Sequence, residues 1–459
     1  MNVMAFKGLV NILPEVEVPK VKPPLKKRLL WTFATLLIFA SLTLVEPIGM
    51  TRAAQQAGFL QNIQLITASN MGTLATLGIG PIVMASIILQ LLNGAGLLQF
   101  NRNDPKEREV FQGLQKFVAI LFSFFEATVY VISGFIPSIP GFWPMFFLIL
   151  QLALGGIIVM FLDEVVSKYG IGSGVGLFIA AGVSFRIFWR AFAWVQQSGQ
   201  FVGLVPQLLQ GFLNGNIPES ALFPLISTII VFLIVVYAES TKIEIPLTFG
   251  RIRGFGARYP LKFFYVSNIP VIFSAALFAN VQLWGIAFQN IGIPIFGTFV
   301  GNQPTPGGLA YYLQAPYGLL ATPTQIGITL GNVDLILRII IFSVAMIIMC
   351  VVFGKFWVEM SGMGAKQVAQ QMQSVGLHVP GFRRDPRVLE QVFNRYIPTL
   401  TVVGSASVGI LAVLADLTGA LGTGTGILLT VGILYRMYEE LAAQEAFEMM
   451  PALRTILGG

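Results

Sequence analysis

Side chains that could carry out catalysis are scarce in this sequence. The only histidine is His378 and the only cysteine is Cys350. The sequence therefore contains no HExxH zinc motif and no serine–histidine pair within an apolar segment. It also contains no GxxxxGKS or GxxxxGKT phosphate-binding loop. These absences predict a protein that is not an enzyme, with no catalytic residues, no metal and no cofactor.

Glycines beside aliphatic residues are the most distinctive local pattern. One apolar run contains Gly78-Ile79-Gly80-Pro81, a second opens with residues 170–176 (GIGSGVG), and a third opens with residues 422–426 (GTGTG). They do not form a nucleotide-binding fingerprint, because no strand–turn–helix surrounds them. Matching glycine-broken segments in two halves of a membrane protein indicate an inverted repeat with a functional path between the halves. Alternatively, the glycines serve only to let helices pack closely.

The elements that must position these glycines are membrane-spanning helices. Of the 459 residues, 55% are hydrophobic and 11% are charged, whereas soluble domains carry roughly 25% charged residues. Ten apolar runs are candidates to cross a bilayer. They are residues 29–45, 72–92, 117–135, 143–162, 171–194, 222–238, 263–288, 335–353, 397–414 and 427–437 with its flanks. The fifth and the tenth run each open with a glycine-rich segment, so the chain divides into two halves of five.

Charge asymmetry predicts the orientation of these helices. With ten spans both termini lie on one side, and that side carries 24 of the 28 Lys and Arg residues. The other four are Arg52, Arg186, Arg190 and Arg338. Lys and Arg accumulate in cytoplasmic loops, so both termini are expected in the cytoplasm.

Two stretches do not fit simple spans. Residues 59–66 form a short amphipathic segment between polar residues, too short to cross a bilayer and therefore interfacial or re-entrant. Residues 289–333 form a long outer loop rich in Gly and Pro, which we expect to pack on the helix bundle.

Several stretches resemble the SecY family of protein-translocation channels, in particular its archaeal and eukaryotic members. They are TASNMGTLATLGIGPIVMASIILQLL (67–92), FQGLQKF (111–117), LDEVVSKYGIGSGVGLFIAAGVS (162–184), VYAESTKIEIPL (236–247), YVSNIPVIFSAALFANVQLW (265–284), GFRRDPR (381–387) and GTGTGILLTVGILYRMYE (422–439). They cover most of the chain in the family's order. The resemblance implies an all-α integral membrane protein, with ten transmembrane helices in two inverted-repeat halves around a central pore. The implied function is to pass unfolded polypeptides across the membrane and to release transmembrane helices sideways into lipid.

The resemblance also implies a ring of aliphatic side chains that closes around the translocating polypeptide. The six residues are Ile79, Val83, Val175, Ile179, Ile272 and Leu429. Ile79 with Val83 and Val175 with Ile179 are i,i+4 pairs, so each pair lies on one helix face. Such a ring offers a substrate no hydrogen bond, and a narrow apolar throat resists water and ions. Without the resemblance, each residue would more often face lipid or the protein core.

Further parts of the channel are implied in the same way. Residues 58–68, with Phe59, Leu60, Ile63 and Ile66, match the family's plug, a short helix that blocks the idle pore. Helices two and three against seven and eight would form a lateral gate to lipid, with polar candidates Thr76, Gln115 and Asn268. Asn268 could equally satisfy backbone groups freed by Pro270.

The two largest basic loops would dock the ribosome. The candidates are Arg251, Arg253 and Arg258 in the six-seven loop, and Arg383, Arg384 and Arg387 in the eight-nine loop. Positive charges suit ribosomal RNA phosphates, although membrane orientation alone explains some of them. The other implied partners are small single-span Sec subunits (SecE/gamma and beta types), signal sequences, the nascent polypeptide and the lipid bilayer. The implied location is the plasma membrane.

One departure from the family concerns helix three. Family members often carry an arginine just before the Gly-Thr-Leu of helix two, where this chain reads Asn70-Met71-Gly72. Glu126 in helix three is then expected to lack a charged partner, and an intramembrane acid is a candidate functional residue.

A secondary transporter for a small solute is the main alternative, because inverted repeats and broken helices occur there too. Transporters usually place polar ligands at the midplane, whereas Ile, Val and Leu flank the glycine breaks here. The expected division is a cytoplasmic segment 1–28, a first half 29–194, an external hinge loop 195–221, a second half 222–440 with cytoplasmic loops 239–262 and 354–396, and a cytoplasmic tail 441–459.

The orientation can be tested by cysteine labelling in intact cells. We expect Arg384→Cys to resist an impermeant maleimide added outside and to react once the cells are opened, because the eight-nine loop is predicted to be cytoplasmic. A cysteine introduced at Asn302, in the predicted outer loop, is the control that should react from outside. Labelling of Arg384→Cys in sealed cells would contradict the predicted topology.

Overall fold

Helices occupy all ten predicted spanning segments. The computed structural model describes residues 13–19, 21, 23–51, 72–94, 97, 105–197, 200–249, 256–300, 303–374, 377–378 and 386–449. The ten helices are α2 (Leu25–Leu42), α4 (Gly80–Gly94), α5 (Pro105–Ile132), α6 (Phe142–Tyr169), α7 (Gly174–Phe192), α9 (Glu219–Ser240), α10 (Ile269–Asn290), α13 (Val333–Met360), α15 (Pro386–Leu417) and α16 (Gly424–Met449). Seven of them, α5, α6, α7, α9, α10, α13 and α15, are long and apolar enough to cross a membrane.

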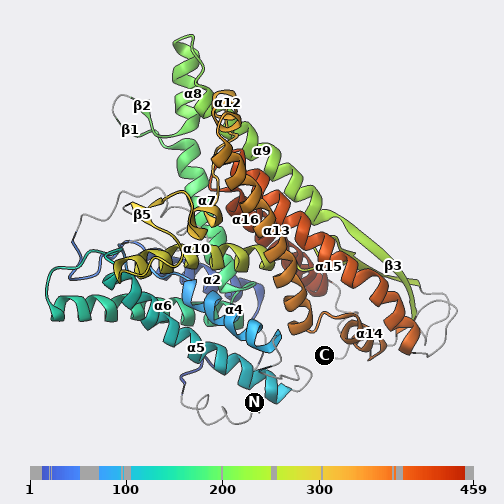
Figure 1. Cartoon of the computed structure of the whole chain (residues 1–459). Helices are drawn as coiled ribbons and strands as arrows, with labels where there is room; N and C mark the ends of the chain where they lie inside the picture. Colours follow the sequence, from blue (N-terminus) through green and yellow to red (C-terminus); the bar gives the residue numbers. More distant parts are fainter. Residues whose placement is uncertain are drawn as a thin grey trace.

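The chain folds as two groups of helices (Figure 1). In the first, α5 packs on α4 and α6, and α6 packs on α2 and α7. In the second, α15 packs on α13, α16 and α9. Helix α10 packs on α13 and α15 of its own half and also on α4 and α5, while α7 packs on α16. The two halves therefore meet through α10 against α4 and α5 and through α7 against α16.

Short elements complete the connections. They are the hairpin β1 (Gln196–Gln197) and β2 (Gln200–Phe201), α8 (Leu204–Leu213), β3 (Lys242–Phe249), β4 (Gly256–Lys262), β5 (Phe299–Val300), β6 (Gln303–Pro304), α11 (Leu309–Leu313), α12 (Pro323–Leu330), α14 (Ala365–Ser374) and β7 (Leu377–His378). The outer loop packs on the bundle as predicted, because α11 contacts α10 and α13 and Phe299 is buried beside α10. Arg338 on α13 fastens this loop, donating a 2.8 Å hydrogen bond to Gln314 Oε1 and lying over the Tyr311 ring.

Helix α4 begins later than the apolar run predicts. Residues 72–79 form turns, and the helix starts at Gly80 with Pro81 as its second residue. Gly78 has φ +52°, in the left-handed region, which ends any helical run before it. Proline suits the first turn of a helix, where its missing N–H costs nothing. Hydropathy alone does not show this break, because residues 72–79 are as apolar as the helix that follows.

The irregular segment 72–79 is accommodated by a glycine on α6. A Cβ at Gly155 would lie 1.9 Å from the backbone oxygen of Leu74. The absence of a side chain at Gly155 therefore lets the backbone of this segment lie directly against α6. Small residues serve the same purpose wherever membrane helices approach closely.

Gly155→Ala is expected to destabilise the protein by about 1–3 kcal/mol, because backbone must move to admit the methyl group. Gly182→Ala is the matched control, since it also lies inside a spanning helix but its Cβ would have no atom within 4 Å. Thermal unfolding in detergent should show a lower Tm for Gly155→Ala and an unchanged or slightly higher Tm for Gly182→Ala. Equal Tm values for the two variants would refute the close contact.

Candidate functional site

Helices α4 and α10 begin with the same backbone geometry. Gly78 before α4 has φ +52°, and Ser267 before α10 has φ +56°. Each is followed three residues later by the proline of the first helical turn, Pro81 or Pro270. The left-handed conformation is rare for a residue other than glycine, so Ser267 marks a backbone shape that the repeat retains. Two residues beyond each proline stand the predicted ring residues, Val83 on α4 and Ile272 on α10.

Helices α7 and α16 also begin alike. Gly172 and Gly422 have φ +71° and +76°. The next residue caps the helix in both cases: Ser173 Oγ accepts a hydrogen bond from the N–H of Gly176 at 3.3 Å, and Thr423 Oγ1 accepts one from the N–H of Gly426 at 3.1 Å. In both helices a hydroxyl bonds to the N3 amide, as at a helix N-cap, although Ser173 has φ −100° and Thr423 has φ +62°. Ile179 and Leu429 each lie three residues after the last of these glycines.

These two helices cross through their glycines. A Cβ at Gly176 on α7 would lie 3.4 Å from Ile433 Cγ2 on α16, and a Cβ at Gly426 on α16 would lie 3.2 Å from Val183 Cγ1 on α7. Ile433 and Val183 occupy the same place in the two repeats, four residues after Leu429 and Ile179. The contact is therefore reciprocal, as in a two-fold interface.

A second pair of contacts extends the crossing and fixes its direction. The start of α7 meets the distal part of α16, where a Cβ at Gly172 would lie 3.5 Å from Met437 Cγ. The start of α16 meets the distal part of α7, where a Cβ at Gly422 would lie 2.6 Å from Ile187 Cγ1. The two helices are therefore antiparallel, and their N-terminal parts overlap with Ile179 and Leu429 near the centre of the crossing.

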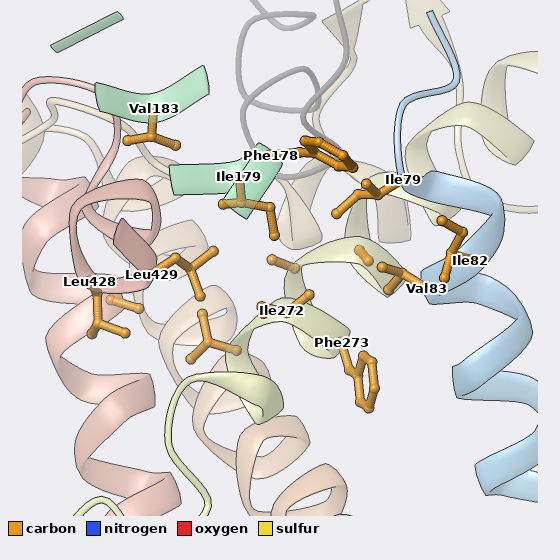
Figure 2. Close-up of a cluster of buried hydrophobic side chains, with 14 of the residues drawn as sticks. Ile79, Ile82, Val83, Phe178, Ile179, Val183, Ile272, Phe273, Leu428 and Leu429 are labelled. Atoms are coloured by element: carbon orange, nitrogen blue, oxygen red, sulfur yellow. The ribbon is translucent and has the colours of Figure 1, made fainter. Parts of the chain in front are cut away.

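The six predicted ring residues belong to one apolar cluster. Ile79, Ile179 and Leu429 are 0% exposed, Val83 is 5% exposed and Ile272 is 9% exposed. Val175 is partly buried and packs against the same cluster. Figure 2 shows Ile79 just before α4, Val83 on α4, Ile179 on α7, Ile272 on α10 and Leu429 on α16 arranged around a common centre. Residues from both halves of the chain thus meet in one apolar cluster, and their role as a pore ring stays a prediction.

The internal repeat shows an asymmetry in the ring that sequence reasoning missed. Ile79 precedes Pro81 by two residues, and Asn268 precedes Pro270 by two, so Asn268 is the counterpart of Ile79. By the same register, Thr425 is the counterpart of Val175. The first half therefore offers four aliphatic residues and the second half two. Comparing the two halves after their glycines and prolines could have revealed this.

Asn268 connects two helices of the second half. It is buried, and its Nδ2 donates a 2.9 Å hydrogen bond to the backbone oxygen of Leu428, the neighbour of Leu429. A Cβ at Gly432 would lie 1.8 Å from Asn268 Nδ2, so glycine is required for this approach. The Asn268 side chain makes no capping hydrogen bond to the start of α10. Its contact is thus with α16 rather than with backbone freed by Pro270.

The other predicted gate residues bond within the first half. Gln115 Nε2 on α5 donates a 2.6 Å hydrogen bond to Ser86 Oγ on α4. Thr76 is buried, and its Oγ1 accepts bonds from the N–H groups of Gly72 and Thr73 at 3.1 Å. Gln115 and Asn268 each form their hydrogen bond within one half. A gate role for them therefore stays a prediction, which rests on their place in the fold. Both residues lie on helices where α4 and α5 meet α10.

Glu126 lies behind the glycine break of α4. It is 4% exposed, and a Cβ at Gly80 would lie 3.0 Å from its Oε2. Its Oε1 has no hydrogen-bond partner among the residues that the structure describes. The predicted plug, residues 58–68 with Phe59, Leu60, Ile63 and Ile66, lies outside the described residues, as do Asn70 and Met71.

The two basic loops meet in one small sheet. Strand β3 pairs antiparallel with β4 of the same six-seven loop, and with β7 of the eight-nine loop through Thr248–His378 and Phe249–Leu377. The sheet lies on an apolar core formed with α14 and the start of α15, which includes Leu247, Leu261, Val368, Leu389 and Phe393. Sequence reasoning treated the loops separately, since a two-residue strand carries no signal.

Two of the predicted docking residues, Arg258 and Arg387, lie in the described part of this region. Arg258 on β4 is exposed and pairs with Glu244 on β3 at 2.8 Å, and Arg387 is exposed at the start of α15. Arg251, Arg253, Arg383 and Arg384 lie outside the described residues.

An ion-pair cluster joins the hairpin to the end of α16. Lys242 Nζ lies 3.0 Å from Glu439 Oε1, and Lys262 Nζ bonds to Glu439 Oε2. The hydrogen bond with Glu439 raises the pKa of Lys242. Burial alone would raise the pKa of Glu439, but the bonds from Lys262 and Lys242 lower it below its ordinary value. This cluster was not predicted from the sequence.

Comparison with known proteins agrees with this geometry. The SecY family model matches residues 73–438. The chain is 46% identical to the protein translocase subunit SecY of Methanocaldococcus jannaschii over 455 residues, which covers 98% of this chain and 100% of that protein. It is 38% identical to the SecY of Haloferax volcanii over 487 residues, covering 99% of each chain.

Solved structures give the same result. One of a protein-conducting channel superposes with a TM-score of 0.84 at 46% identity, covering 97% of this chain and 98% of that one. Sec61 in a canine ribosome–channel complex from the endoplasmic reticulum superposes with a TM-score of 0.82 at 46% identity, with the same coverage. The fold is that of a multi-pass protein-conducting membrane channel. The chain belongs to the SecY family.

Proposed function

We propose that this protein is the pore-forming subunit of a channel that passes unfolded polypeptides across the membrane. The observation that carries the proposal is the single apolar cluster in which four helices from two halves present Ile79, Val83, Ile179, Ile272 and Leu429. A solute transporter needs polar ligands near its midplane. The six residues proposed to form the ring are all aliphatic, which does not favour transport of a small polar solute.

The physical basis of the function is an apolar constriction. A narrow apolar throat excludes water, because hydrating it offers no hydrogen bonds in return, and ions cannot pass a dry throat. A translocating polypeptide pushes the side chains aside and meets no group that would bind one sequence more than another. The same ring can therefore seal the idle channel and pass many substrates.

Lateral release requires the two halves to separate. The contacts of α10 with α4 and α5 and of α13 with α4 support a gate between these helices. A hydrophobic signal helix would replace these contacts with its own apolar side chains. Residues 58–68 would act as the plug that blocks the outer half of the idle pore. Thr76, Gln115 and Asn268 would set how easily the helices part, because polar groups in a membrane interface contribute modest hydrogen bonds.

The cytoplasmic sheet is proposed as the ribosome-docking site. A related channel, canine Sec61, is bound to a ribosome in its structure. The sheet gives both basic loops one rigid base, so that Arg251, Arg253, Arg258, Arg383, Arg384 and Arg387 can act together on RNA phosphates. The apolar core below the sheet supports this arrangement.

The remaining partners and the location follow from the family and from charge. Small single-span Sec subunits of the SecE/gamma and beta types would complete the complex. The concentration of Lys and Arg on one side supports cytoplasmic termini, and the plasma membrane is the proposed location.

The channel function is tested by widening the ring. Replacing Ile79, Ile179 and Leu429 with Ser is expected to make idle channels in planar bilayers conduct ions, because polar side chains let water enter the throat. Selectivity for signal sequences should loosen as well, since the closed state loses apolar packing. Replacing the lipid-facing Ile229, Ile234 and Leu233 on α9 with Ser is the control, and should produce no leak. Ring variants that stay electrically silent even after deletion of residues 58–68 would exclude these residues as the constriction.

Ribosome docking is tested by charge reversal. Arg383→Glu with Arg384→Glu should weaken ribosome binding and reduce its salt dependence, by about one unit of slope for each phosphate that the protein no longer neutralises. Lys26→Glu with Lys27→Glu is the matched control, since it makes the same change in net charge on exposed residues of α2. Ribosome co-sedimentation over a range of salt measures both. An equal loss of ribosome binding in the two variants would show that the loop arginines do not dock the ribosome and serve only membrane orientation.

A further inference from the structure

A carboxylate from the end of α6 holds the N-terminus of α7. Asp163 Oδ1 accepts a 2.7 Å hydrogen bond from the N–H of Val175, and the N–H of Gly174 interacts with the same carboxylate. Both N–H groups are among those that the start of a helix leaves without an intrahelical partner. A negative charge at this end is also favoured by the helix dipole.

The N-terminus of α16 is held in the same way by the end of α15. Asp416 Oδ1 accepts a 2.7 Å hydrogen bond from the N–H of Gly424, and the N–H of Thr425 interacts with the same carboxylate. Asp416 is 2% exposed. Gly424 and Thr425 are the first two residues of α16, as Gly174 and Val175 are of α7. The two carboxylates therefore bind the same two positions of the two repeat-related helices.

Glycine at the first helical position permits each contact. A Cβ at Gly174 would lie 2.5 Å from Asp163 Cα, and a Cβ at Gly424 would lie 2.4 Å from the backbone nitrogen of Asp416. With any residue other than glycine at positions 174 and 424, the Cβ would collide with the preceding helix. The spacing in sequence differs between the halves, since Asp163 precedes its glycine by eleven residues and Asp416 by eight. The shared geometry therefore does not follow from equal loop lengths.

The predicted ring residues lie at a fixed distance from these two contacts. Ile179 and Leu429 are each five residues beyond the first glycine of their helix, which is about 7.5 Å along the axis. Because α7 and α16 are antiparallel, the two carboxylates lie at opposite ends of the crossing. A helix whose start is not fixed can slide or turn, and a register change of one residue turns a side chain by about 100°.

We propose that Asp163 and Asp416 are positioning residues that fix the height and rotation of α7 and α16 and thereby keep Ile179 and Leu429 in the closed ring. This rests on the channel function proposed above. It assigns the sealing of the pore partly to two residues outside the ring, one at each end of the helix pair.

The experiment compares single channels of the full chain, reconstituted with the subunits that co-purify with it. Asp163→Ala and Asp416→Ala should each raise the open probability of the idle channel by about tenfold, because each removes a hydrogen bond to a charged group. The double variant should leak more than either single variant. Asp163→Asn and Asp416→Asn keep an acceptor but lose the charge, and should leak less than the alanine variants but more than the parent.

Two controls separate this role from loss of charge or of stability. Glu164→Gln changes the residue next to Asp163, which pairs with Lys116 and Lys168 instead, and Asp334→Asn removes an exposed charge at the start of α13. Both should stay closed. A purely structural role for Asp163 or Asp416 would lower Tm and yield and leave the conductance of the folded channels unchanged.

The outcomes are distinct. Folded alanine variants that stay as closed as the parent would overturn the proposal. If the alanine variants do not fold, the asparagine variants decide, and parental open probability in both would overturn it. A parent that translocates no polypeptide in proteoliposomes would instead refute the channel function, whatever the aspartate variants do.

Discussion

The antiparallel crossing of α7 and α16 joins the two halves of the molecule and sets the position of the proposed ring. Four glycines allow it, and each receives a side chain from the same position of the other repeat: Gly172, Gly176, Gly422 and Gly426 against Met437, Ile433, Ile187 and Val183. In a membrane, helix association depends on close packing rather than on the hydrophobic effect. Each helix thus fixes the depth of the other, and Ile179 and Leu429 are brought together at the middle of the pair. The contact of α10 with α4 and α5 then adds Ile272, Ile79 and Val83 to the same centre.

Irregular backbone beside this centre is tolerated because protein surrounds it. Residues 72–79 and 263–268 lie in turns next to spanning helices, and backbone N–H and C=O groups without partners are costly in lipid. In the segment 72–79, Thr76 Oγ1 accepts a hydrogen bond from the N–H of Gly72, and the missing side chain of Gly155 makes room for the backbone. Asn268 donates a hydrogen bond to the backbone of α16. Broken helices that line a protein-enclosed path are the form in which membrane proteins accept such backbone. The breaks shorten α4 and α10 and place their first turns, which carry Val83 and Ile272, at the centre of the molecule.

Much of this architecture could be predicted from the sequence, because bilayer thickness forces long apolar segments and glycines mark helix breaks. All ten predicted segments contain helices, and the packing of the outer loop was expected. Helix α4 begins eight residues after the start of its apolar run, at the Gly78–Pro81 break that the glycine pattern indicated and hydropathy alone does not show. The pairing of β7 with β3 was missed because it depends on tertiary contact between distant loops. The counterparts Asn268 and Thr425 were missed, although their spacing from Pro270 and Gly424 repeats that of Ile79 and Val175 from Pro81 and Gly174.

The central claim is that four helices from two halves surround one path for a polypeptide. Site-specific photocrosslinking tests it most directly, with a benzophenone residue at Val83, Ile179, Ile272 or Leu429 and a nascent chain arrested during translocation. We expect all four positions to crosslink to the same short stretch of the arrested chain, while a probe at Ile234, which is exposed on α9, should not crosslink to that chain. Probes at the four positions that react only with lipid or with neighbouring helices, while the arrested chain crosslinks elsewhere on the protein, would contradict it.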